Sequence, residues 1–81
     1  MSQKNQLIKF LYEQLAQRSD LPVESITPET QLTDLGIQSI DAVLLCGEIE
    51  DRFAVEMDPA DIFEHDTVGA FAQSILTRMV T

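Results

Sequence analysis

Apolar residues recur at helical spacing in three stretches of this chain, and no stretch alternates in the manner of a β-strand. Residues three and four positions apart lie on one side of an α-helix, so each stretch predicts an amphipathic helix. The first runs from Gln3 to Arg18 and the second from Ser39 to about Phe53. The last follows Thr67, a residue type favoured as N-cap.

A further, short helix is predicted between the second and the last. Asp58 followed by Pro59 is typical of an N-cap and a first helical residue, and this helix should end near Glu64. His65 then falls in the turn that follows. Three long helices and one short helix predict an all-α fold, a small four-helix bundle, with residues 1–81 forming a single domain.

A long loop should join the first two helices. It spans residues 19–38, contains Pro22 and Pro28, and has Gly36 near its end to permit a chain reversal. Loops of this length in compact domains are usually functional or well anchored. The apolar residues expected to anchor it in the core are Val23, Ile26, Leu32 and Leu35.

Charge and composition exclude several classes of function. The net charge of −9 argues against nucleic acid or an anionic membrane as a partner and favours basic protein surfaces. No apolar run approaches the roughly 20 residues of a membrane span, so we expect a cytoplasmic protein. We also expect a monomer. With one cysteine, Cys46, and one histidine, no disulfide or structural zinc site is expected. Cys46 should be a small buried side chain.

The predicted helix over residues 39–53 has apolar residues on two faces. A core-facing stripe comprises Ala42, Leu45, Cys46, Ile49 and Phe53. The opposite face comprises Ile40, Val43, Leu44 and Gly47, interleaved with Glu48 and Asp51. This face either packs under the long loop or is an exposed patch for other proteins, and we favour the second alternative. A mid-helix glycine costs about 1 kcal/mol, so Gly47 indicates a packing reason or the close approach of a partner or a carried chain.

Ser39 lies where this face meets the predicted helix N-terminus, as its N-cap. Free N–H groups and the helix dipole suit this position to a phosphate, although a plain N-cap serine is the ordinary alternative. Nucleophilic catalysis is a poorer account, because His65 lies in another segment without an orienting partner. The acids also lack calcium-loop spacing. We therefore predict no catalytic residue and no metal site.

Three segments together resemble the acyl carrier protein family. Residues 32–43, LTDLGIQSIDAV, are similar to its signature L-x-x-L-G-x-D-S-[LI]-x-x-V. Residues 48–53, EIEDRF, resemble the L-E-x-x-F that closes its second helix, and residues 67–69, TVG, match the opening of its last helix. The three segments occur in the family's order and at its spacing, between residues 32 and 69.

The resemblance implies a non-catalytic carrier. A phosphopantetheinyl transferase would use magnesium and coenzyme A to attach 4′-phosphopantetheine to Ser39, whose arm then carries an acyl group as a thioester. Acyl-loading and condensing enzymes with basic docking surfaces would be the further partners. The recognition residues would be Asp41, Glu48 and Asp51 with Ile40, Val43, Leu44 and Gly47.

Departures from the family pattern leave alternatives open. Gln38 replaces the usual Asp before the serine, Leu44 a common Glu, and Gly47 a larger apolar residue. These changes favour polyketide or other specialised acyl metabolism over bulk fatty acid synthesis. Gln38 also suggests a peptidyl or aminoacyl carrier of a nonribosomal pathway, and an acidic adaptor without a prosthetic group is the rival from another class. The Met1 start favours a free-standing protein.

Overall fold

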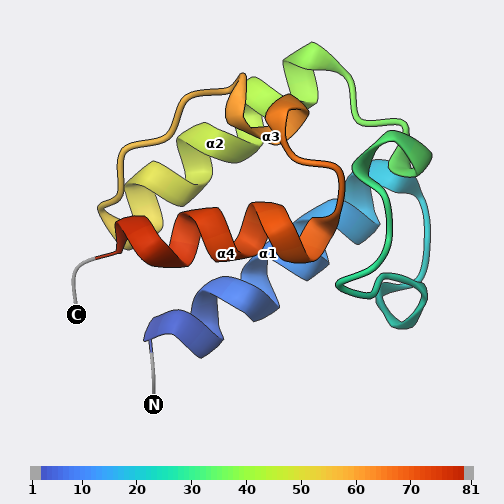
Figure 1. Ribbon diagram of the computed structural model, residues 1–81, viewed down its shortest axis with the longest axis horizontal. Coiled ribbons are helices and arrows are strands. Elements are labelled where there is room, and N and C mark those ends of the chain that lie inside the picture. Colours follow the sequence, from blue (N-terminus) through green and yellow to red (C-terminus); the bar gives the residue numbers. More distant parts are fainter. Residues whose placement is uncertain (1–2, 80–81) are drawn as a thin grey trace.

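The computed structural model describes residues 3–79, which form four α-helices and two short 3₁₀ turns (Figure 1). The helices are α1 (Gln3–Ser19), α2 (Ser39–Phe53), α3 (Asp61–Glu64) and α4 (Val68–Arg78), and the 3₁₀ turns are η1 (Val23–Ser25) and η2 (Leu32–Leu35). No strand occurs within residues 3–79, only an isolated bridge between Gln31 and Thr67. The predicted all-α class and the four helices are confirmed.

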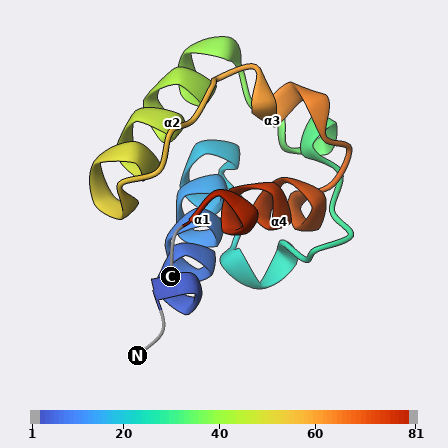
Figure 2. The ribbon, with the colours of Figure 1, turned by 60° about the vertical axis from the view of Figure 1, so that its left-hand side comes forward.

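The core lies where α2 and α4 pack against α1, which contacts both (Figure 2). From α1, Leu7, Leu11 and Leu15 are fully buried. Full burial of such a side chain contributes roughly 1.5–3 kcal/mol, so these stripes are the main source of stability. The core-facing residues predicted for α2 are all buried: Ala42, Leu45, Cys46, Ile49 and Phe53. The apolar stripe that the sequence predicts for the last helix is buried at Val68, Phe71, Ala72, Ile75 and Met79, whereas Leu76 is only partly buried.

The loop between α1 and α2 is tied to the segment that leads into α4. The Leu32 N–H donates to the Asp66 carbonyl at 2.9 Å, and the Gly69 N–H donates to the Pro28 carbonyl at 2.9 Å. A Cβ at Gly69 would lie 2.9 Å from that same carbonyl oxygen, so this approach requires glycine. Of the predicted anchors, Ile26, Leu32 and Leu35 are buried, but Val23 is 39% exposed and that prediction is wrong.

The chain turns into α2 through Gly36, whose φ of 67° is left-handed and favours glycine. Gln38 has extended backbone angles and is the N-cap, so Ser39 is the first residue of the helix. The prediction that Ser39 is itself the N-cap is therefore wrong by one position. The helix ends at Phe53, and its C-cap Ala54 also has a left-handed φ, of 53°.

The short helix α3 begins at Asp61, two residues later than the predicted first helical residue, Pro59. The Asp58 side chain accepts from the Ala60 N–H at 3.0 Å, which closes a turn before the helix instead of capping it. His65 follows α3, as predicted, and its Nδ1–H donates to the Asp61 carbonyl at 2.8 Å. Thr67 caps α4, because its hydroxyl accepts from the Ala70 N–H at 3.2 Å.

Candidate functional site

Ser39 is exposed at the start of α2. Within residues 3–79 its hydroxyl has no hydrogen-bond partner, and the N-cap side chain of Gln38 makes no capping bond. The first helical hydrogen bond runs from the Ala42 N–H to the Gln38 carbonyl at 3.0 Å, so the N–H groups before it have no helical acceptor. A free hydroxyl therefore stands beside unsatisfied donors at the positive end of the helix.

The second face of α2 is exposed. Ile40 is 61% exposed, Val43 50% and Leu44 52%. We call these three residues the apolar patch. The long loop does not cover it, which excludes the first of the two alternatives drawn from the sequence. Large exposed side chains in such proximity are typical of a binding surface, whereas scattered ones need no explanation.

Gly47 lies on the same face, and the structure offers no reason for it within the described part of the chain. A Cβ placed there would have no atom within 4 Å. The expected packing reason inside the protein is therefore absent among residues 3–79. The close approach of a partner or a carried chain stays a prediction.

Two of the three acids expected to recognise partners are paired with Arg18 at the end of α1. Arg18 Nη1 lies 3.4 Å from Asp41 Oδ1, and Nη2 lies 3.6 Å from Glu48 Oε2. The side chains of Arg18, Asp41 and Glu48 are 16%, 29% and 51% exposed. Sequence analysis missed this cluster, although a base in the last turn of a helix that packs against the next could have suggested it. Asp51 is exposed and has no ion pair among residues 3–79.

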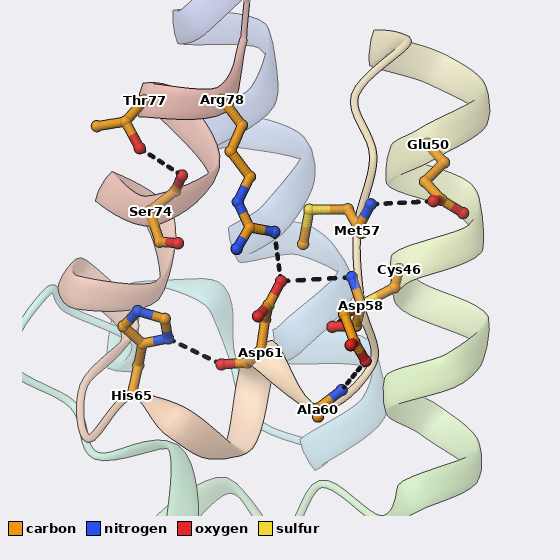
Figure 3. A network of polar contacts seen from close by, with 10 residues as sticks. All are labelled: Cys46, Glu50, Met57, Asp58, Ala60, Asp61, His65, Ser74, Thr77 and Arg78. Carbon is orange, nitrogen blue, oxygen red and sulfur yellow. Dashed lines mark hydrogen bonds and ion pairs between the residues drawn. The ribbon is translucent and has the colours of Figure 1, made fainter.

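A second polar network joins α3 to α4 (Figure 3). Asp61 is 6% exposed, forms an ion pair with Arg78, and accepts from the Asp58 N–H at 3.3 Å through the same oxygen. The hydrogen bond from Arg78 lowers the pKa of Asp61 and outweighs burial, which acts in the opposite direction. Nearby, the Glu50 carboxylate accepts from the Met57 N–H at 2.9 Å. These acids tie α3 to α4 and α2 to the segment that follows it.

Cys46 is buried at 2% exposure, as predicted. Burial, with Asp61 and Glu50 nearby, raises the pKa of its thiol to about 11. The thiol is therefore neutral at physiological pH and is not a nucleophile. Within residues 3–79 no three potential ligands gather as a metal site, and no helix has the length and apolarity to cross a membrane.

A cavity of about 280 Å³ lies between the η2 turn and α3, close in the chain to Ser39. Its apolar walls come from Leu32, Ile37, Ile62 and Phe63, and its polar ones from Thr33, His65 and Asp66. Ile37 precedes Ser39 by two residues. A shallower, more polar groove of about 750 Å³ lies around Arg78 and residues 54–58.

Comparison with known proteins agrees with this arrangement. Acyl carrier protein 3 of Ralstonia nicotianae is 46% identical over 55 residues, which make up 67% of this chain and 63% of that protein. A phenolphthiocerol/phthiocerol polyketide synthase of Mycobacterium tuberculosis is 39% identical over 49 residues, 60% of this chain. The matched residues are only 3% of that synthase.

The fold has a close counterpart among solved structures. A free-standing peptidyl carrier protein from a secondary metabolic pathway of Acinetobacter baumannii superposes with a TM-score of 0.78 at 24% identity, covering 91% of this chain and 92% of the other. The family model described as "Phosphopantetheine attachment site" matches residues 9–75. This chain therefore belongs to the family of carrier proteins that hold 4′-phosphopantetheine covalently.

Proposed function

We propose that Ser39 is the attachment residue and that the chain carries acyl intermediates, which it delivers to enzymes of polyketide or fatty-acid-like metabolism. The attached group supplies a terminal thiol, on which cargo is held as a thioester. The observation that carries this proposal is the exposed, unpartnered hydroxyl of Ser39 at the first position of α2. The polyketide synthase and acyl carrier relatives support acyl cargo.

The residues around Ser39 fit a phosphodiester. The N–H groups of the first turn of α2 lack helical acceptors and can donate to phosphate oxygens. Gln38 is neutral, so it places no negative charge directly before the phosphate. The cavity walled by Ile37 and Phe63 offers an apolar surface to the arm or to short cargo.

Intact mass spectrometry tests the attachment. The protein is incubated with coenzyme A, magnesium and a broad-specificity phosphopantetheinyl transferase, and we expect a gain of one phosphopantetheine group. Ser39→Ala should gain nothing, whereas Ser25→Ala, a change at another exposed serine, should gain as the wild type does. No gain in the wild type, or an equal gain in Ser39→Ala, would show that Ser39 is not the site.

A peptidyl or aminoacyl carrier is the second candidate, because Gln38 stands where acyl carriers usually have Asp. Loading assays separate the two. The holo protein is offered to acyltransferases with acyl-coenzyme A and to adenylating enzymes with amino acids and ATP. Acylation by the first group supports the proposal, and exclusive aminoacylation would replace it.

We further propose that the transferase and the acyl-loading and condensing enzymes dock on the exposed face of α2, through the apolar patch and neighbouring acids. The neutral Leu44 and small Gly47 on this face support a partner set from a specialised pathway. An acidic adaptor without a prosthetic group is the remaining rival. It predicts full activity in Ser39→Ala, which distinguishes it from any carrier.

A further inference from the structure

We propose that Arg18 determines partner specificity by neutralising Asp41 and Glu48, so that partners recognise the apolar patch and Asp51. This inference rests on the proposed docking role of α2. The inference states which acids a basic partner can bind, because contacts within this chain already occupy some of them.

Helical spacing sets where each charge lies around the apolar patch. At about 100° per residue, Asp51 shares the side of α2 that carries Ile40 and Leu44. Asp41 and Glu48 lie on the flank that faces α1, where Arg18 contacts both. Glu50 lies on the opposite flank, and its carboxylate accepts the Met57 N–H at 2.9 Å. Of these four acids, only Asp51 has no hydrogen bond or ion pair within residues 3–79.

Arg18 is mostly buried where α1 meets α2, with its guanidinium beside the two acids. Its side chain is 16% exposed, and its Nε is buried without a hydrogen-bond partner in the described chain. The other end of the guanidinium contacts Asp41, Glu48 and also Gln14, whose Oε1 is 3.5 Å from Nη2. Salt screens partly buried pairs less than exposed ones. A partner's lysine or arginine would have to share these acids with Arg18, whose positive charge weakens their attraction for it, whereas Asp51 has no such competitor among the described residues.

The geometry therefore defines the partner's chemistry. Ser39 and Asp51 are twelve positions apart, about 18 Å along the helix axis at ~1.5 Å per residue. The fitting surface is an apolar groove for Ile40, Val43 and Leu44 with a basic side chain about 18 Å from the entrance to its active site. A partner whose basic residues cluster beside the attachment serine would instead face Asp41 and Glu48, which are already paired with Arg18, and would gain little affinity from them.

A synthetic amphipathic Leu/Lys helical peptide serves as a probe that requires no enzyme. Its affinity is measured by fluorescence anisotropy at low salt for the wild type, Arg18→Gln and Lys9→Gln. Lys9→Gln makes the same change in net charge on an exposed position of α1. We expect Arg18→Gln to bind about fivefold more tightly and Lys9→Gln to change affinity by less than about twofold, from the usual strength of exposed pairs. Equal effects of the two variants would mean that only net charge matters and would overturn the proposal.

A double-mutant cycle tests the pairing directly. Asp41→Asn should change affinity by less than about twofold in the wild type but lower it about threefold in Arg18→Gln, because only then is the carboxylate available. Asp51→Asn should lower it about threefold in both backgrounds. Additive effects of Arg18→Gln and Asp41→Asn would contradict the inference. Thermal melts verify that each variant is folded. Sedimentation of the free protein tests whether a second copy of the chain occupies the apolar patch, a result that would also contradict the inference.

Transferase kinetics then connect the inference to the function. We expect kcat/KM for modification of Arg18→Gln to rise and to fall more steeply with salt than that of Lys9→Gln. Indistinguishable salt profiles would overturn the proposal while leaving Ser39 as the attachment site. If no variant, wild type included, gains the group, the proposed function fails, and the peptide titration still decides the role of Arg18.

Discussion

Replacing Asp61 by asparagine removes the charge of the one buried charged residue among residues 3–79. α3 has four residues and cannot be stable alone, so its position depends on contacts such as the bonds of Asp61 to Arg78 and to the Asp58 N–H. Each contributes roughly 1 kcal/mol net, and exposure of Arg78 limits the ionic part. Asparagine keeps one acceptor oxygen but loses the charge that strengthens both bonds, so we expect Asp61→Asn to lose about 1 kcal/mol of unfolding free energy, which lowers Tm by about 5 °C in a chain of this size.

The pH dependence gives this prediction a sharper form. The pKa of Asp61 is lowered in the folded protein, so its carboxylate stabilises the fold above the unfolded value of about 3.9. That contribution is lost as pH falls through the folded pKa. Thermal melts at stepped pH should show the wild type and Asp61→Asn converging below pH 4. Asp34→Asn, at an exposed acid, is the control and should shift Tm little. A difference under about 0.5 kcal/mol at pH 7, or one that persists unchanged at low pH, would refute the reasoning.

Three further substitutions and one labelling experiment have outcomes set by local geometry. Gly69→Ala should cost about 1–3 kcal/mol in urea denaturation, because its Cβ would lie against the Pro28 carbonyl oxygen. Gly47→Ala should instead stabilise by about 0.5–1 kcal/mol, since nothing lies near its Cβ, and a loss would contradict the described surroundings. Thr67→Ala should lower the free energy of unfolding by about 1 kcal/mol, because it removes the hydroxyl that caps α4, whereas the conservative Thr67→Ser should change it little. Cys46 should resist iodoacetamide at pH 8, where about one thiol in a thousand is ionised, and react once urea unfolds the chain; rapid labelling of the folded protein would refute its burial.

Periodicity was sufficient to predict the helices because burial of one face is a repeating, local property. The limits of α2 at residues 39 and 53 and the cap at Thr67 agree with the pattern. Positions that depend on a single turn follow the pattern less closely. Asp58 and Pro59 have the local preferences of a helix start, yet the Asp58 side chain closes a turn before α3.

Long-range contacts explain the other differences. Val23 is apolar and in the loop, but only the path of the chain decides that Ile26 is buried and Val23 is not. The ion pairs of Arg18 with Asp41 and of Arg78 with Asp61 join residues 23 and 17 positions apart. Local patterns do not specify such pairs, since each charge taken alone resembles an ordinary solvated residue. Asp41, which the sequence presented as a recognition residue, is thereby paired within the protein.

Gly47 links the energetics of α2 to its proposed use. A helix of 15 residues with a glycine near its middle gives up roughly 1 kcal/mol relative to alanine, and no neighbouring atom within 4 Å of the Cβ position requires the smaller residue. The glycine shares its face with Ile40 and Leu44, which are also costly to expose. Both the glycine and the exposed apolar side chains lower the stability of the free protein. Their position on one face, opposite a well-packed core, is consistent with a surface that is stabilised when a partner binds. If Gly47→Ala raises stability but leaves probe binding and transferase kinetics unchanged, then this glycine serves neither packing nor docking, and the apolar patch alone must support the interface.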